Sequence, residues 1–113
     1  MMLDEFYQAL INALTCYFPQ TTTTFTTTRN ITLTCRVEID ADTFIFIYFS
    51  ALTGKTSYAL IYLDQRVAGF DNYRFWHYHS AEAPNQHIPC AEPTPEDVLS
   101  VLAEACVKLG NKA

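Results

Sequence analysis

Positive charge is scarce in this sequence. Seven Lys and Arg residues stand against twelve Asp and Glu residues, which gives a formal net charge of −5. A chain of this balance repels a nucleic acid backbone and an anionic membrane surface, so extended contact with either is excluded. RNA could be bound only through a local basic site.

Long apolar runs and a basic leader are also missing. The first twenty residues contain Asp4 and Glu5 instead of a basic segment, and no apolar run reaches the length that crosses a bilayer. We therefore expect a cytoplasmic protein that makes no contact with a membrane.

The sequence has no closely spaced cysteine pair. Its four cysteines lie far apart, which excludes a zinc knuckle and a CxxC redox motif. In a cytoplasmic protein, Cys16, Cys35 and Cys106 are predicted to be small core residues. Cys90 lies in a different context, described below.

What the sequence does contain is enough apolar material for one folded domain. The chain has 113 residues, of which 50% are hydrophobic and 14% aromatic, so we expect a single domain over residues 1–113. Apolar spacing predicts helices at 4–17 and 95–110, and alternation with turn residues predicts strands at 21–28, 31–39, 44–49, 57–63 and 67–72. The predicted fold is α+β, an antiparallel meander of four to five strands with both helices on one face.

The central strands predict a second apolar surface. Residues 44–63 are apolar at positions that face both sides of the sheet, whereas two terminal helices can cover only one side. The other side would be covered by the segment after Asn72 or by another copy of the chain. We expect a homodimer.

Candidate functional residues gather in one segment, from Asp71 to Cys90. This stretch holds all three histidines and the single tryptophan. Alternation predicts that the preceding strand continues to about His79, with His77 and His79 on one side, and that residues 80–93 form a loop.

The first interpretation of this segment is a metal site. His77 and His79 on one strand face, with His87 and Cys90 from the loop, supply four ligands of types that zinc accepts. The alternative is that the histidines are aromatic surface or interface residues. Apart from zinc, no cofactor is expected.

The second interpretation is acid/base chemistry on a phosphodiester. In it one of His77 and His87 takes a proton from the substrate and the other returns one, while Arg74 or Arg66 neutralises the developing charge. Asp71 with Asn72 could orient a histidine. Asp71 and Asn72 could equally be a turn at the end of a strand. The same surface would offer three binding residues: Arg66, Trp76 and Tyr78.

Gly69-Phe70-Asp71-Asn72, followed by a histidine-bearing loop with His87 and a closing helix, resembles the TumE-like family of small toxins. The resemblance covers about residues 31–103, and it implies the toxin half of a toxin–antitoxin pair. Phe70, Asp71 and Asn72 match the family motif, but Gly69 stands where the family carries arginine. The resemblance therefore implies an RNA-directed, ribonuclease-type toxin with an antitoxin partner, or an inactive, diverged relative.

Three hypotheses follow from the sequence. The first is a TumE-like toxin, the second is a non-catalytic dimerising interaction module, and the third is a metal-binding protein with a His/Cys cluster.

Overall fold

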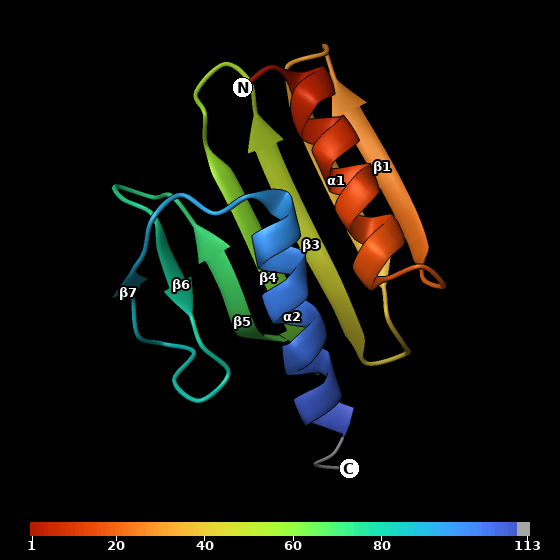
Figure 1. Cartoon of the computed structure of the whole chain (residues 1–113), viewed down its shortest axis with the longest axis vertical. Coiled ribbons are helices and arrows are strands. Elements are labelled where there is room, and N and C mark those ends of the chain that lie inside the picture. The colour runs from red at the N-terminus through yellow and green to blue at the C-terminus, as the bar shows by residue number, and fades with distance from the viewer. Residues whose placement is uncertain (111–113) are drawn as a thin grey trace.

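The computed structural model describes residues 1–110, which form two helices and one sheet (Figure 1). The elements are, in chain order, α1 (Leu3–Tyr17), β1 (Thr22–Thr28), β2 (Thr32–Glu38), β3 (Thr43–Ser50), β4 (Thr56–Tyr62), β5 (Gln65–Asp71), β6 (His77–His79), β7 (Ile88–Pro89) and α2 (Pro95–Gly110). The predicted α+β class is confirmed.

The sheet is an antiparallel meander in which each strand pairs with the next one along the chain. Two of its turns have residues with positive φ at both central positions: Arg29 and Asn30 (54° and 55°), and Leu63 and Asp64 (50° and 64°). Such turns match the twist of an antiparallel pair and favour tight hairpins. The sheet has seven strands, so the predicted number of four to five is wrong.

The hydrophobic core lies between the sheet and the two helices, which cover the same face (Figure 1). Alternate positions of the strands point into it, as a two-residue period requires. Among them Leu33, Cys35, Val37, Ile45, Ile47 and Leu60 are fully buried. Helix α1 contacts β2 and β3, whereas α2 contacts β5. Thr94 caps α2, because its hydroxyl accepts from the Asp97 N–H and the Asp97 carboxylate accepts from the Thr94 N–H.

The opposite face of the sheet, which we call the outer face, has no helix on it. Phe46 is 40% exposed there, and its neighbours Phe44, Tyr48 and Ile61 are only half-buried. The segment after Asn72 extends the sheet sideways as β6 and β7 and leaves Phe46 on the central strands exposed. The homodimer stays a prediction.

Alternation had predicted that the strand continues to about His79, but β5 ends at Asp71, so this prediction is wrong. The chain reverses through residues 72–76, where Arg74 has a φ of 70°, and β6 runs back antiparallel to β5. Within the predicted loop at 80–93, residues 88 and 89 form the short edge strand β7. The prediction that His77 and His79 point to the same side is nevertheless confirmed.

The four cysteines are free thiols in the part of the chain that the structure describes. Cys35 is buried and Cys106 is half-buried against the core, as predicted. Cys16 is exposed, so its assignment to the core is wrong. Over residues 1–110, no helix combines the length and apolarity needed to span a bilayer.

Candidate metal centre

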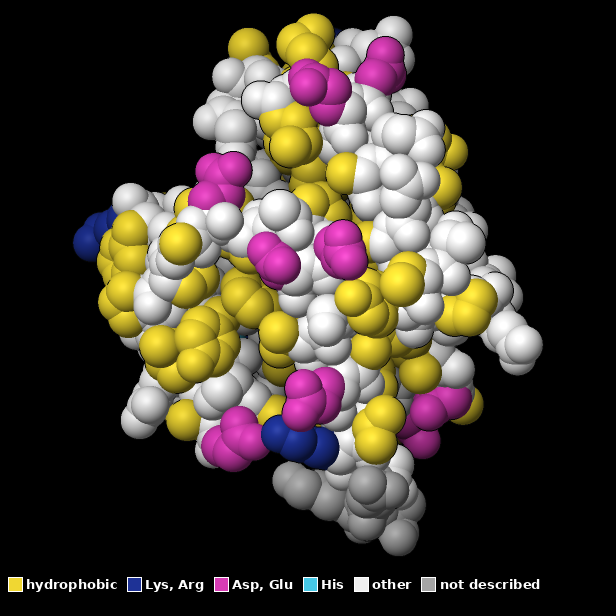
Figure 2. Space-filling view, viewed as in Figure 1, with side chains coloured by type: hydrophobic (Ala, Val, Ile, Leu, Met, Phe, Trp, Pro, Cys, Tyr) yellow, Lys and Arg dark blue, Asp and Glu magenta, His cyan; other side chains and the backbone are white. Residues whose placement is uncertain are grey.

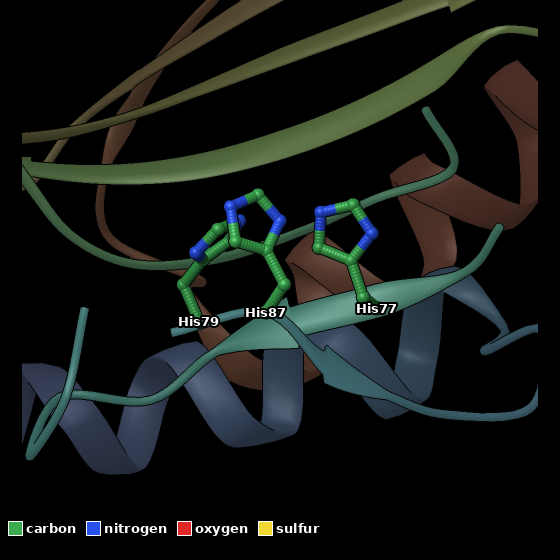
Figure 3. A group of neighbouring side chains, drawn as sticks. All are labelled: His77, His79 and His87. Carbon is green, nitrogen blue, oxygen red and sulfur yellow. The ribbon is translucent and has the colours of Figure 1, made fainter. Parts of the chain in front are cut away.

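Pairing of β5 with β6 brings Asp71 directly opposite His77. His79, two residues along β6, lies opposite Gly69 and points to the same side, because alternate residues of a strand share a face. That side is the outer face: Figure 3 shows the imidazole rings on the side of β6 away from α2. In the space-filling view of the helix-bearing face no histidine is visible (Figure 2).

His87 joins this pair from the start of the β7 edge. Pairing of β6 with β7 places Ile88 opposite Tyr78 and Pro89 opposite His77, and Figure 3 shows the ring of the preceding His87 grouped with those of His77 and His79. The ring centroids of His77 and His79 lie 5.1 Å apart, and each lies 4.7 Å from that of His87. One ligand nitrogen from each ring lies within 4.8 Å of the others.

Two backbone carbonyls fix the orientation and the tautomer of the buried rings. Nδ1 of His77 lies 2.9 Å from the Phe75 carbonyl oxygen, and Nδ1 of His79 lies 2.9 Å from the Pro84 carbonyl oxygen. A carbonyl can only accept a hydrogen bond, so each Nδ1 must carry the proton. In a neutral ring, Nε2 then holds a free lone pair. Carbonyls bonded to Nδ1 in this way are typical partners of metal-binding histidines.

The Nε2 atoms of His77 and His79 are buried, and neither has a hydrogen-bond partner among the described residues. The Asp71 carboxylate is close, with Oδ1 3.2 Å from Nε2 of His77 and Oδ2 3.6 Å from Nε2 of His79. These contacts have the separation of ion pairs but not the geometry of hydrogen bonds. Buried polar atoms are rarely left unpaired, so this pair calls for an explanation.

These separations fit a shared metal ion. Two ligands bonded at 2.0–2.1 Å in a tetrahedral arrangement lie about 3.3 Å from each other. The three histidines alone form the compact donor group, and Asp71 faces it with one carboxylate oxygen 3.2 Å from His77 Nε2 and the other 3.6 Å from His79 Nε2. His87 is exposed, whereas His77 and His79 are each only 2% exposed. The exposed imidazole of His87 is less constrained by packing and could move closer to an ion held by His77 and His79. Three nitrogens and a carboxylate oxygen form a donor set that suits zinc and similar divalent ions.

The electrostatic surroundings favour the neutral form of His79. Burial lowers its pKa below the ordinary value, and the nearby Arg66 guanidinium lowers the pKa further. The hydrogen bond to the Pro84 carbonyl opposes both effects. Because metal ions bind neutral imidazole, a lowered pKa keeps this ligand available at neutral pH.

Cys90, which the sequence suggested as a fourth ligand, does not join the histidines. Its backbone N–H donates to the Trp76 carbonyl oxygen, and its side chain packs against the core, across the sheet from His87. Burial also raises the pKa of its thiol, which disfavours the thiolate that a metal requires. Asp71, and not Cys90, lies beside His77 and His79 in the structure.

Asn72 and the two arginines take different positions. The Asn72 side chain accepts from the Thr56 N–H at 2.9 Å and donates to the Gly54 carbonyl at 2.8 Å, so it links the end of β5 to the turn before β4. Arg66 reaches the carbonyl oxygen of Pro84, the same oxygen that His79 contacts. Arg74 instead lies over the ring of Tyr73. Arg66 is therefore the arginine beside the histidine group.

Trp76 and Tyr78 alternate with the histidines and therefore face the helices. Tyr78 stacks on Phe70 with a centroid separation of 5.6 Å, and both Trp76 and Tyr78 pack against the core. The side chains of these two aromatic residues therefore lie on the other face of the sheet from the three imidazoles.

Gly69 lies on the outer face between the neighbouring strands. A Cβ atom there would come within 2.4 Å of the Tyr58 carbonyl oxygen, so this backbone has no room for the arginine of the TumE-like motif. The carbonyl groups of Phe75 and Pro84 were not anticipated from sequence, since backbone acceptors leave no signature in side-chain patterns.

No family model, curated protein or solved structure matches the chain.

Proposed function

We propose that this protein binds a divalent transition metal ion of the zinc type through His77, His79, His87 and Asp71. The observation that carries the proposal is the pair of buried Nε2 atoms that have no hydrogen-bond partner within residues 1–110. A metal ion would satisfy both lone pairs at once and would neutralise the adjacent carboxylate. Without it, two buried acceptors face a negative charge at close range.

The exposure of His87 gives this centre a side that solvent can reach. Three imidazoles with a carboxylate nearby can hold a metal ion while leaving a position for water, as catalytic zinc sites do. We infer a centre capable of hydrolytic chemistry, in which water enters on the exposed side, at His87, as a further ligand beside Asp71.

The first test is metal binding itself. Native purification should yield about one metal ion per chain by elemental analysis, and the metal-free protein should take up Zn²⁺ in a calorimetric titration. Cobalt substitution would report the coordination geometry by absorption spectroscopy.

Two variants make the test specific. His87→Ala removes an exposed side chain, so it should fold normally and lose at least about tenfold in metal affinity. Cys90→Ser is the matched control, because it changes a candidate ligand on the opposite face and should leave the affinity unchanged. Wild-type protein that takes up no metal, or a Cys90→Ser variant that alone loses it, would overturn the proposal.

A second candidate function is an RNA-directed toxin held in check by an antitoxin. The observation that favours it is the position of Arg66, which lies beside the same histidine group as Asp71 and could take the place of the missing family arginine. Induced expression should then arrest growth, and either Arg66→Ala or His87→Ala should relieve the arrest. A harmless wild-type protein would contradict this function and leave the metal centre to be judged separately.

The interaction module is supported only by the uncovered outer face. If this face pairs two copies, the protein in solution should have twice the monomer mass of 12.9 kDa. Phe46→Arg should then restore the monomer, because it places a charge in the apolar contact. A monomeric wild-type protein in light scattering would contradict the dimer.

A further inference from the structure

A second site lies on the other side of the sheet from the histidines. A cavity of about 170 Å³ opens near the first turns of α1 and α2, where it lies over β3 and β4. Four of its lining residues are aromatic, and these are joined by one carboxylate and two prolines: Phe6, Phe49, Tyr58, Trp76, Glu92, Pro93 and Pro95. Neither the metal centre nor its proposed chemistry uses this cavity.

The aromatic walls are held in place by the core. Phe6 and Phe49 stack with a centroid distance of 4.3 Å and an interplanar angle of 5°, and Tyr58 lies 6.2 Å from Phe6. These three side chains are at most 4% exposed. Their positions are therefore set before any ligand arrives, which lowers the entropic cost of binding.

The charge of the cavity comes from Glu92. Its carboxylate accepts a hydrogen bond from the indole N–H of Trp76 at 3.3 Å, so it is held beside an aromatic ring. Burial raises the pKa of the Tyr58 phenol, and the negative charge of Glu92 raises that pKa further. The charge of Glu92 is therefore felt at the Tyr58 wall of the cavity.

The surrounding surface has the same sign. No Lys or Arg lines the cavity among the described residues. Figure 2 shows acidic side chains over the middle and upper part of this face, with Lys and Arg visible only at its left edge and near its lower end. Met1 also lines the cavity, but it is 66% exposed and can move aside.

We propose that this cavity binds a small organic cation, an alkylammonium or quaternary ammonium group, between the aromatic side chains and the Glu92 carboxylate. The faces of aromatic rings carry negative potential and attract such cations, which are also weakly hydrated and enter apolar surroundings readily. An anionic ligand would meet Glu92 with no Lys or Arg side chain in the described lining to balance its charge. A neutral ligand could at most donate a hydrogen bond to the carboxylate and would lack the attraction between opposite charges.

The single tryptophan supplies the measurement, since Trp76 lines the cavity and no other residue contributes indole fluorescence. Choline is the probe, and 3,3-dimethylbutan-1-ol is its uncharged counterpart of nearly the same shape. Choline should change the Trp76 emission saturably, with the uncharged alcohol roughly tenfold weaker. NMR shifts of the wall residues during the same titration would locate the bound cation.

Variants of two glutamates separate charge from structure. Glu92→Gln keeps an oxygen that can accept from Trp76 but removes the charge, so choline should bind at least about fivefold more weakly. Glu96→Gln is the matched control on α2, outside the cavity lining, and should bind like the wild type. A metal chelator should have no effect, because the histidine centre lies on the other face. Equal binding of choline and the alcohol, or no shift by either method, would overturn the proposal.

Discussion

The carboxylate of Asp71 and the imidazole of His77 face each other across the β5–β6 pair, with Oδ1 3.2 Å from Nε2. The same oxygen accepts a hydrogen bond from the Tyr73 N–H at 3.0 Å, so the carboxylate is fixed by the chain reversal that separates the two strands. One tight reversal therefore positions both groups.

Removing the charge of Asp71 should weaken the metal centre. Asp71→Asn keeps an oxygen for the Tyr73 N–H, so the turn should persist while the negatively charged ligand is lost. We expect the Zn²⁺ affinity to fall by at least about tenfold, as measured by competition with a chromophoric chelator. An unchanged affinity would show that Asp71 takes no part in the centre.

We expect the Asn72 side chain to stabilise the fold and to take no part in metal binding. Asn72→Ala removes the acceptor of the Thr56 N–H and the donor to the Gly54 carbonyl, and it should lower the free energy of unfolding by about 1–3 kcal/mol in urea. Metal affinity should stay within about twofold of wild type, because neither hydrogen bond touches the histidine group. A stable Asn72→Ala variant with impaired metal binding would restore the functional role that the sequence suggested.

Gly69 should tolerate no side chain. In Gly69→Ala the new Cβ would meet the Tyr58 carbonyl oxygen at 2.4 Å, so β4 and β5 must shift, at a cost of about 1–3 kcal/mol in unfolding free energy. Gly110→Ala is the control, because no neighbouring side chain or strand within residues 1–110 comes within 4 Å of its Cβ position. Helix propensity should stabilise that variant by no more than about 1 kcal/mol. Equal stability of the two variants in urea unfolding would contradict the close approach.

The metal-free protein should lose stability in mild acid, partly through His79. Its folded-state pKa is lowered from 6.5, so below about pH 6.5 the unfolded chain binds a proton that the folded chain resists. The free energy of unfolding should therefore fall as the pH drops from 7.5 through 6.5 toward the folded pKa. Urea unfolding in a chelator should show a smaller decrease for His79→Gln, which keeps His77 and His87 as internal controls. A parallel decrease in both proteins would contradict the lowered pKa.

The thiols should differ sharply in reactivity. Burial raises the pKa of Cys35 to about 12 and that of Cys106 to about 11, whereas Cys16 is exposed at the surface of α1. A maleimide at pH 7.5 should modify Cys16 first and leave Cys35 unmodified until the protein unfolds. Peptide mass spectrometry would read the order, and early labelling of Cys35 would indicate that the core opens readily.

Much of the fold could be predicted because its signals are local. The alternation of Leu33, Cys35 and Val37 and the capping residues before α2 act between near neighbours in sequence, and both gave elements close to those observed. The reversal at residues 72–76 was missed. Alternation runs unbroken through it, and the positive φ of Arg74 has no glycine to mark it.

The sequence by itself determined that Asp71, His77, His79 and His87 lie in one segment and that His77 and His79 share a face. Only the tertiary structure decided that Asp71 joins them, that Cys90 does not, and that the Phe75 and Pro84 carbonyls hold the rings. The physical reason is strand register. Pairing of β5, β6 and β7 sets which residues stand opposite each other, and a shift of one residue would send these side chains to the other face.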